Sequence, residues 1–300
     1  MEEKNKSPKD MPTALDCAIR ENEQNFDGGY VVNNTTKYFN YICNDDWQKY
    51  LDEMETIHQE QYGKGSGGEL KAGKYPPKMA SFGSSSRLIY ELSKNEKGFN
   101  FEERLDTRVG GIANLDGFIR RGSNYIYIEA KMREIYYPSH EFQEIKSVYV
   151  PVYKKIVEIC SDFDFSQDNS EAENGEETYR ISFKIQDRPV RYFDLKQLIC
   201  HFLGIAYDIV KHSVNNAEIT FLYLLYDPKD VEQYIDEKYR TKVKERFKEV
   251  VDFIENNTNL FKRIFDAVIR YQAETHNLEK PNIKFDFKLV DQHKYKSEIE

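Results

Sequence analysis

Two carboxylates and a lysine fall within one short segment, residues 110–133, whose pattern predicts a β-hairpin. Gly122-Ser123 is a favoured two-residue hairpin loop between alternating apolar residues. Counting outward from this loop places Asp116 directly opposite Glu129. Lys131 lies two residues beyond Glu129, so its side chain faces the same way. The segment therefore predicts three charged side chains that meet on one face of a sheet.

The alternation of the hairpin predicts one apolar face and one polar face. The apolar face is expected in the core and consists of Ala113, Leu115, Ile119, Ile126, Ile128, Ala130 and Met132. Two like charges directly opposed weaken a hairpin, so the Asp116 and Glu129 pair predicts a divalent cation between them. Mg²⁺ takes one or two carboxylates together with waters and substrate phosphate, and Mn²⁺ is expected to substitute for it.

This combination predicts a metal-dependent phosphodiesterase. The cation would polarise the phosphate and help to generate hydroxide. Lys131 would steer the attacking water or stabilise the charge that develops on the phosphate oxygens.

The hairpin resembles the active-site motif of the PD-(D/E)xK restriction-endonuclease-like nuclease superfamily, and more closely a bacterial group within it. The likeness covers most of residues 70–290, but only the hairpin is diagnostic, and Leu115 stands where the motif name has proline. The segments that carry the resemblance are Pro76-Pro77-Lys78, Ser84-Ser85-Ser86-Arg87, Phe101-Glu102, Ala113-Asn114-Leu115-Asp116, Glu129-Ala130-Lys131-Met132-Arg133-Glu134 and a later helix with Gln197.

The resemblance implies a role for each of these site residues. Asp116 and Glu129 bind the metal, the Ala130 carbonyl adds a ligand, and Lys131 activates water or stabilises charge. Glu102 is the expected third carboxylate, with Glu91 on the preceding helix as the alternative, because many members of the superfamily place a glutamate there.

Two helix residues and one strand-end residue complete the candidate site. Gln197 resembles the helix glutamine that lines the pocket in related nucleases, where it would hold water or a phosphate oxygen. His201 lies one turn further along the same helix, although a lone helix histidine is more often a packing residue. Glu134 follows Lys131 by three residues and is either a supporting acid or a solvated one.

An ordinary interpretation of the motif is an exposed strand with a solvated ion pair, which contributes little to stability. Glu-x-Lys is common in this chain, since Glu69-Leu70-Lys71 and Glu144-Ile145-Lys146 also match. The apolar alternation, the predicted register and the opposed aspartate favour the catalytic interpretation of Glu129-Ala130-Lys131.

Composition sets the outer limits of the prediction. A chain of 300 residues can bury a sizeable core as one large domain or two small ones. It has no apolar run long enough for a bilayer and no secretory signal, and its four cysteines form no Cys-x-x-Cys pair, so we expect a cytoplasmic protein with reduced thiols. The net charge of −9 argues against sequence-independent affinity for a polyanion, so a nuclease would need a local basic groove.

The order of elements predicts an α/β fold, a restriction-endonuclease-like mixed central sheet flanked by helices, with an extra N-terminal helical segment. Residues 1–75 would form the helical extension and a Gly/Lys-rich linker, and residues 76–300 the core, with a mobile acidic insertion at 161–178. Helices are expected at 15–25, 44–62, 84–94, 139–148, 152–159, 193–212, 227–254 and 259–273. Strands are expected at 99–109, 110–133 as the hairpin, 179–186 as a short edge strand, 217–226 and 283–290.

We therefore expect a Mg²⁺-dependent nuclease that acts on DNA in restriction or repair. Cutting both strands of a duplex would suggest a two-fold homodimer. The alternative is a catalytically silent module on the same fold that binds nucleic acid or a partner protein, which the acidic balance favours. A third interpretation is a structural protein that assembles through its tyrosine-rich surface.

Overall fold

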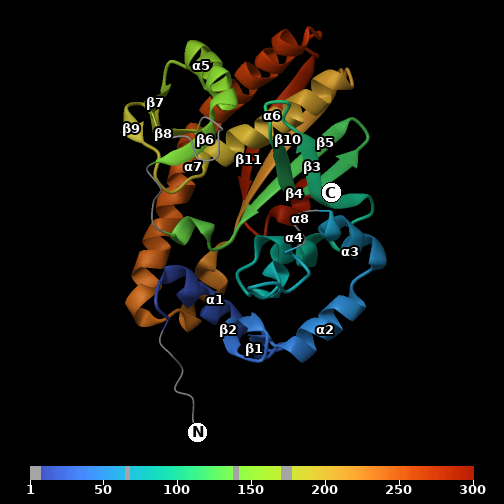
Figure 1. The fold of residues 1–300 in the computed structure, drawn as a ribbon, viewed down its shortest axis with the longest axis vertical. Helices are drawn as coiled ribbons and strands as arrows, with labels where there is room; N and C mark the ends of the chain where they lie inside the picture. The colour runs from blue at the N-terminus through green and yellow to red at the C-terminus, as the bar shows by residue number, and fades with distance from the viewer. Residues whose placement is uncertain (1–7, 65–67, 138–141, 170–177) are drawn as a thin grey trace.

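A computed structural model describes residues 8–64, 68–137, 142–169 and 178–300 of the chain (Figure 1). At its centre is a five-stranded mixed sheet with the order β11-β10-β5-β4-β3. β3 (Phe99–Asp106), β4 (Ile112–Arg121) and β5 (Asn124–Lys131) form an antiparallel meander. β10 (Ala217–Leu225) and β11 (Ile283–Val290) then continue the sheet in parallel to β5.

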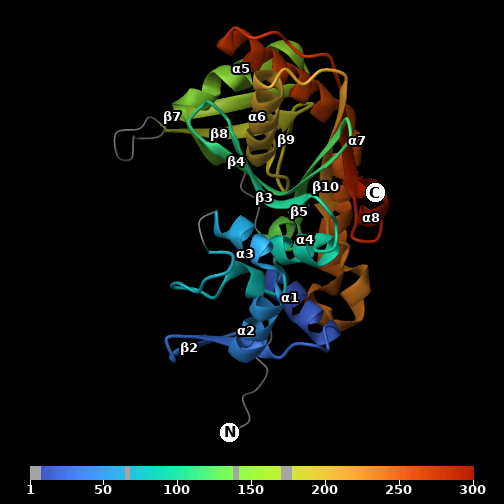
Figure 2. The ribbon, with the colours of Figure 1, turned by 90° about the vertical axis from the view of Figure 1, so that its right-hand side faces the viewer.

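Helices cover both faces of this sheet (Figure 2). α4 (Ser85–Ser93) packs on one face, and α6 (Leu195–Lys211) packs on the other, against β3 and β4. α7 (Glu237–His276) lies along α6 and β11. The expected α/β class, the mixed sheet and its flanking helices are confirmed. Ser84 and Asp194 cap α4 and α6 through their side chains, as helix starts of this composition predict.

The hairpin has the predicted register. Its pairs run from Arg121 with Asn124 to Gly117 with Ile128, and the seven residues expected in the core are all buried. The opposite face is also covered, because Glu129 and Lys131 contact α6.

The alternation of β3 changes at Glu102, whose φ of 54° is left-handed. Phe101 packs against Tyr62 and Tyr90 on the side of α4, whereas Leu105 lies against Gly204 of α6. Regular alternation would put Phe101 and Leu105 on the same face. The distortion at Glu102 therefore turns the two halves of the strand toward different layers.

Between β5 and α6 the chain forms a second, smaller sheet of order β6-β8-β7, with β9 paired to β8. Its elements are β6 (Gln143–Lys146), α5 (Val150–Ile159), β7 (Phe163–Asn169), β8 (Thr178–Ile185) and β9 (Arg188–Pro189). The helix expected at 139–148 is wrong in its described part, which forms β6 and a 3-10 turn (Ser147–Tyr149). β6 pairs with β8, which is central in this sheet rather than at its edge.

Part of the segment predicted as an acidic insertion forms the strand β7, which pairs with β8. Phe163 and Phe165 anchor this strand, because Phe165 packs against Tyr153 and Phe163 packs against Phe183. Residues 170–177 of that insertion lie outside the described residues.

The N-terminal segment contains more than the expected helices. α1 (Met11–Asn22), α2 (Asn44–Glu53) and α3 (Thr56–Gly63) are helical, but β1 (Gly28–Val32) and β2 (Thr36–Ile42) form a hairpin. Its turn spans residues 33–35, and Asn33 and Asn34 both have positive φ, as asparagine tolerates. The buried residues of this segment belong to the same continuous core as those of the central sheet.

In the C-terminal part, one long helix takes the place of the two helices expected at 227–254 and 259–273. After a 3-10 segment (Pro228–Tyr234), α7 runs without a break through Asn257 and Thr258. The side chains of both residues donate to backbone carbonyls one turn earlier, which accommodates poor helix formers. The remaining elements are 3-10 turns at Lys78–Ala80 and Glu134–Tyr136, and α8 (Tyr295–Ile299). Across the described ranges, none of the helices has the length and apolar character needed to span a bilayer.

Candidate active site at the end of the β4–β5 hairpin

The candidate site forms where β4 and β5 separate. The pairing of the two strands ends at Gly117 and Ile128, one step before the expected Asp116–Glu129 pair. At that point the Asp116 side chain replaces the strand partner, because its Oδ2 accepts a hydrogen bond of 2.7 Å from the amide of Ala130. The carboxylate is thereby fixed on the backbone between Glu129 and Lys131.

Asp116 is in an environment that disfavours its charged form. Burial raises the pKa of this carboxyl well above its usual range, and the nearby charges of Glu129 and Glu102 raise it further. Lys131 and the Ala130 amide oppose this effect without overcoming it. A cation beside the carboxylate would remove the penalty, which makes Asp116 a group that favours a positive ligand.

Glu129 and Lys131 form a buried ion pair, with Nζ 2.5 Å from Oε1. Burial favours the neutral form of Glu129, but Lys131 and His201 outweigh it and lower the pKa of the carboxyl to about 2. Lys131 Nζ also donates a hydrogen bond of 2.8 Å to Oε1 of Gln197 on α6. The structure thus brings together Lys131 and Gln197, which the sequence places far apart.

His201 is part of the same cluster. Its Nε2 lies 3.0 Å from Oε2 of Glu129, so the two oxygens of this carboxylate have a lysine and a histidine as neighbours. The expectation of a packing histidine missed this contact. The available signal was its spacing of one helical turn from Gln197, which directs both side chains toward the same part of the sheet.

Glu102 and Glu91 have different surroundings. Oε1 of Glu102 accepts a hydrogen bond of 3.3 Å from Ser86, and burial together with Glu69 raises the pKa of Glu102 to about 7. Glu91 instead accepts a hydrogen bond from Tyr50 and pairs with Lys94. Of these two acids, Glu102 is the one whose charge raises the pKa of Asp116, which supports it over Glu91 as the third carboxylate.

The basic residues near the hairpin have protein partners. Arg133, which is partly exposed, pairs with the buried Asp16 of α1 at 2.6 Å, and Lys78 pairs with Glu69 at 2.9 Å. Arg87 of α4 pairs with Glu23 at 2.5 Å rather than with Glu91, which lies one turn further along the same helix.

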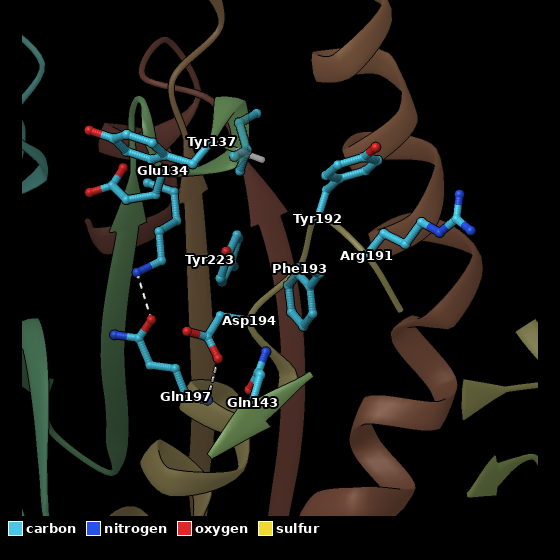
Figure 3. A pocket seen from close by; sticks show the side chains of 11 residues that line it. Glu134, Tyr137, Gln143, Arg191, Tyr192, Phe193, Asp194, Gln197 and Tyr223 are labelled. Carbon is cyan, nitrogen blue, oxygen red and sulfur yellow. Dashed lines mark hydrogen bonds between the residues drawn. The ribbon is translucent and has the colours of Figure 1, made fainter. Parts of the chain in front are cut away.

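A cavity of about 150 Å³ opens beside Lys131. Figure 3 shows Glu134, Tyr223, Asp194 and Gln197 around it. Glu134 accepts a hydrogen bond of 2.8 Å from the Met132 amide, so this acid also stabilises the end of β5. A small anion could reach the lysine by this route.

The site offers few ligands for Mg²⁺, but their chemistry suits this ion. Within the described residues, no three side chains among His, Cys, Asp and Glu gather closely enough to hold a metal. Mg²⁺ needs only one or two carboxylates, however, and completes its shell with water and substrate oxygens. Asp116 and Glu129 supply these two groups. The Ala130 carbonyl points to the same side of β5 as its amide, toward Asp116.

Comparison of this chain with protein-family models, with curated proteins and with solved structures gives no match. The function therefore has to be argued from the site itself.

Proposed function

We propose that this chain is a Mg²⁺-dependent nuclease of restriction-endonuclease-like fold that hydrolyses phosphodiester bonds in DNA. The observation that carries the proposal is the attachment of the Asp116 carboxylate to the Ala130 amide, between Glu129 and Lys131. It places two carboxylates and a lysine at the one point where the hairpin strands part.

The order of the core elements supports the proposal. α4 is followed by the β3–β4–β5 meander, then α6, then β10 in parallel to β5. This is the order expected for the endonuclease-like core. The smaller sheet and α5 are inserted before α6, and β11, which follows α7 in the chain, extends the sheet beyond β10.

Each side chain has a task that its surroundings suit. Asp116, Glu129 and the Ala130 carbonyl would hold Mg²⁺, which supplies Lewis-acid polarisation of the phosphate when bound. Lys131 keeps its positive charge. Burial lowers its pKa, but the acidic groups around it, Glu129 foremost, together raise the pKa more, and the net direction is upward. It can therefore stabilise the negative charge that develops on phosphate oxygens. Gln197 fixes the position of the ammonium group.

The net reaction is hydrolysis. A water oxygen forms a bond to phosphorus as the bond from phosphorus to the leaving sugar oxygen breaks, and one proton reaches that oxygen. The lysine remains protonated throughout, so the proton comes from water.

Cleavage of supercoiled, linear and single-stranded DNA with Mg²⁺, with Mn²⁺ and with EDTA tests the proposal. We expect Asp116→Asn and Lys131→Met to lower the metal-dependent rate at least about 100-fold, as removal of a group that stabilises the transition state does. Lys71→Met is the matched control, because Lys71 ends another Glu-x-Lys motif and is exposed. Circular dichroism verifies that the variants fold. Undiminished cleavage by both site variants would refute the assignment.

One observation favours the alternative of a binding module that does not cut. Both oxygens of Glu129 already have a positively charged or basic neighbour, which can substitute for a metal ion. Calorimetric titration of Mn²⁺ into the wild type and Asp116→Asn separates the two functions. A silent module would take up no Mn²⁺ at this site and would bind DNA equally well in EDTA.

A further inference from the structure

A second and larger cavity lies next to the candidate site and plays no part in the proposed chemistry. Its volume is about 690 Å³, and it is enclosed by the start of β4, by β6 and α5, and by the first half of α6. Figure 1 shows these elements grouped in the upper part of the molecule. The residues relevant to its function are Asn114, Tyr149, Lys196, Gln197, Cys200 and His201.

The larger cavity adjoins the site through α6. Asp194 and Gln197 line both cavities, so the larger one begins on the other side of the residue that holds Lys131. Only the side chain of Gln197 would separate a ligand in the larger cavity from the ammonium group of Lys131. A phosphate bound at Lys131 and a group in the larger cavity can therefore belong to the same molecule.

His201 supplies an independent sign of a ligand. The residue is only 2% exposed and lines the larger cavity. Its Nε2 lies 3.0 Å from Oε2 of Glu129, but neither Nε2 nor Nδ1 forms a hydrogen bond of good geometry with the residues that the structure describes. Buried polar atoms are nearly always paired, and an unpaired one calls for a bound group or water.

The size and lining of the cavity identify the kind of ligand. Pockets of about 300–1,000 Å³ hold small molecules, so a duplex cannot enter but a single nucleotide can. Tyr149 offers a ring on which a base can stack, and the amides of Asn114 and Gln197 can pair with the edge of a base. Lys196 lies at the same cavity and adds positive charge for a neighbouring phosphate.

We infer that this cavity binds one unpaired nucleotide of the substrate strand, next to the phosphate that Lys131 contacts. The inference rests on the proposed nuclease function and specifies its substrate: a single strand, an overhang, or a nucleotide displaced from a duplex. The inserted sheet with α5, which encloses the cavity, then serves substrate selection.

Calorimetry in EDTA tests this pocket without any cleavage. The probes are the four deoxynucleoside 5′-monophosphates, with deoxyribose 5-phosphate as the ligand that lacks a base. We expect at least one monophosphate to bind and the sugar phosphate to bind at least about tenfold more weakly, since stacking provides much of such affinity. Tyr149→Ala should weaken binding of that monophosphate by about tenfold. Tyr234→Ala, which removes a 41% exposed tyrosine that lines neither cavity, should leave it unchanged.

Two further measurements make the test decisive if Tyr149→Ala unfolds. Asn114→Ala changes an exposed side chain and should also weaken binding of the monophosphate. The ¹⁵N resonance of His201 Nδ1 should shift when the monophosphate is added to the wild type. Equal binding of the sugar phosphate, or an unshifted His201 resonance together with wild-type affinity in Asn114→Ala, would overturn the inference.

The outcomes also separate this inference from the proposed function. If the protein binds the monophosphate but cuts no substrate with Mn²⁺, the pocket is supported and the nuclease assignment is refuted. If the protein cuts duplex DNA but binds no monophosphate, the nuclease assignment is supported and the nucleotide pocket is refuted.

Discussion

Oδ2 of Asp116 accepts a hydrogen bond of 2.7 Å from the backbone amide of Ala130, where the next backbone pair of the hairpin would otherwise form. The side chain thus takes the place of a strand partner and keeps a half-buried carboxylate next to Glu129. Burial and the charges of Glu129 and Glu102 raise the pKa of Asp116. Mg²⁺ binding and the protonation of Asp116 should therefore compete.

Asp116→Asn should abolish metal binding and leave the fold intact. The amide oxygen of asparagine can still accept the Ala130 hydrogen bond, so the hairpin should keep its structure. Without Mg²⁺ the variant should be at least as stable as the wild type, because it lacks a carboxyl whose charged form burial and two neighbouring acids disfavour. With Mg²⁺ at a hundredfold excess over its Kd, the wild type should gain about 2.7 kcal/mol and the variant almost nothing.

Scanning calorimetry with EDTA and with Mg²⁺ measures both effects. Asp164→Asn is the matched control, because Asp164 also accepts a backbone amide bond, from Phe165 at 2.8 Å, but is exposed. An Asp116→Asn protein that Mg²⁺ stabilises as much as the wild type would show that the ion binds elsewhere.

Glu102 should make stability depend on pH near neutrality. Its pKa is raised from 4.5 to about 7, so the folded protein holds a proton that the unfolded chain has released between these values. The free energy of unfolding should therefore fall as pH rises through this window. At 1.36 kcal/mol per pKa unit, the loss is at most about 3 kcal/mol.

Urea unfolding at several pH values between about 5 and 8 tests this dependence. Glu102→Gln should flatten the part of the profile that this residue causes, because glutamine cannot titrate. Glu91→Gln, in the helix that precedes the sheet, is the control and should leave the slope as it is in the wild type. If Glu102→Gln leaves the slope unchanged, the proton is held by another acid.

The hairpin and the strands around it could be predicted from sequence because their signals are local. The Gly122-Ser123 loop sets the register, and the apolar alternation assigns the core face. β11 has the expected bounds, Ile283–Val290, because apolar residues alternate there with Lys284, Asp286 and Lys288.

The contacts of the site with α6 could not be predicted in the same way. The spacing of Gln197 and His201 indicates that both face the same part of the sheet. Which strand residue His201 meets depends on how α6 is placed against the sheet, and no local signal fixes that placement. The left-handed φ of Glu102 could not be predicted from the sequence either, because glutamate has no preference for that conformation. Tertiary packing imposes it and thereby turns Leu105 toward α6.

Gly204 controls how closely α6 approaches the sheet. A Cβ added at this position would lie 2.7 Å from Cβ of Ala113 and 2.9 Å from Cβ of Leu105. Alanine in place of glycine usually stabilises a helix by up to about 1 kcal/mol. Here we expect the opposite sign, because both neighbours are next to the backbone and cannot rotate away. Overpacking of this kind costs about 1–3 kcal/mol, so Gly204→Ala should destabilise the protein by about 1 kcal/mol or more.

The same change should reduce cleavage, because α6 carries Gln197 and His201 to Lys131 and Glu129. Urea unfolding and the cleavage assay measure the two effects. The double variant Gly204→Ala with Ala113→Gly removes one of the colliding atoms and should recover part of both losses. The two substitutions should thus be non-additive by about 0.5–3 kcal/mol, the range for residues in contact. Strict additivity would mean that the helix is held at its distance by other contacts, and that the geometry of the site does not depend on this glycine.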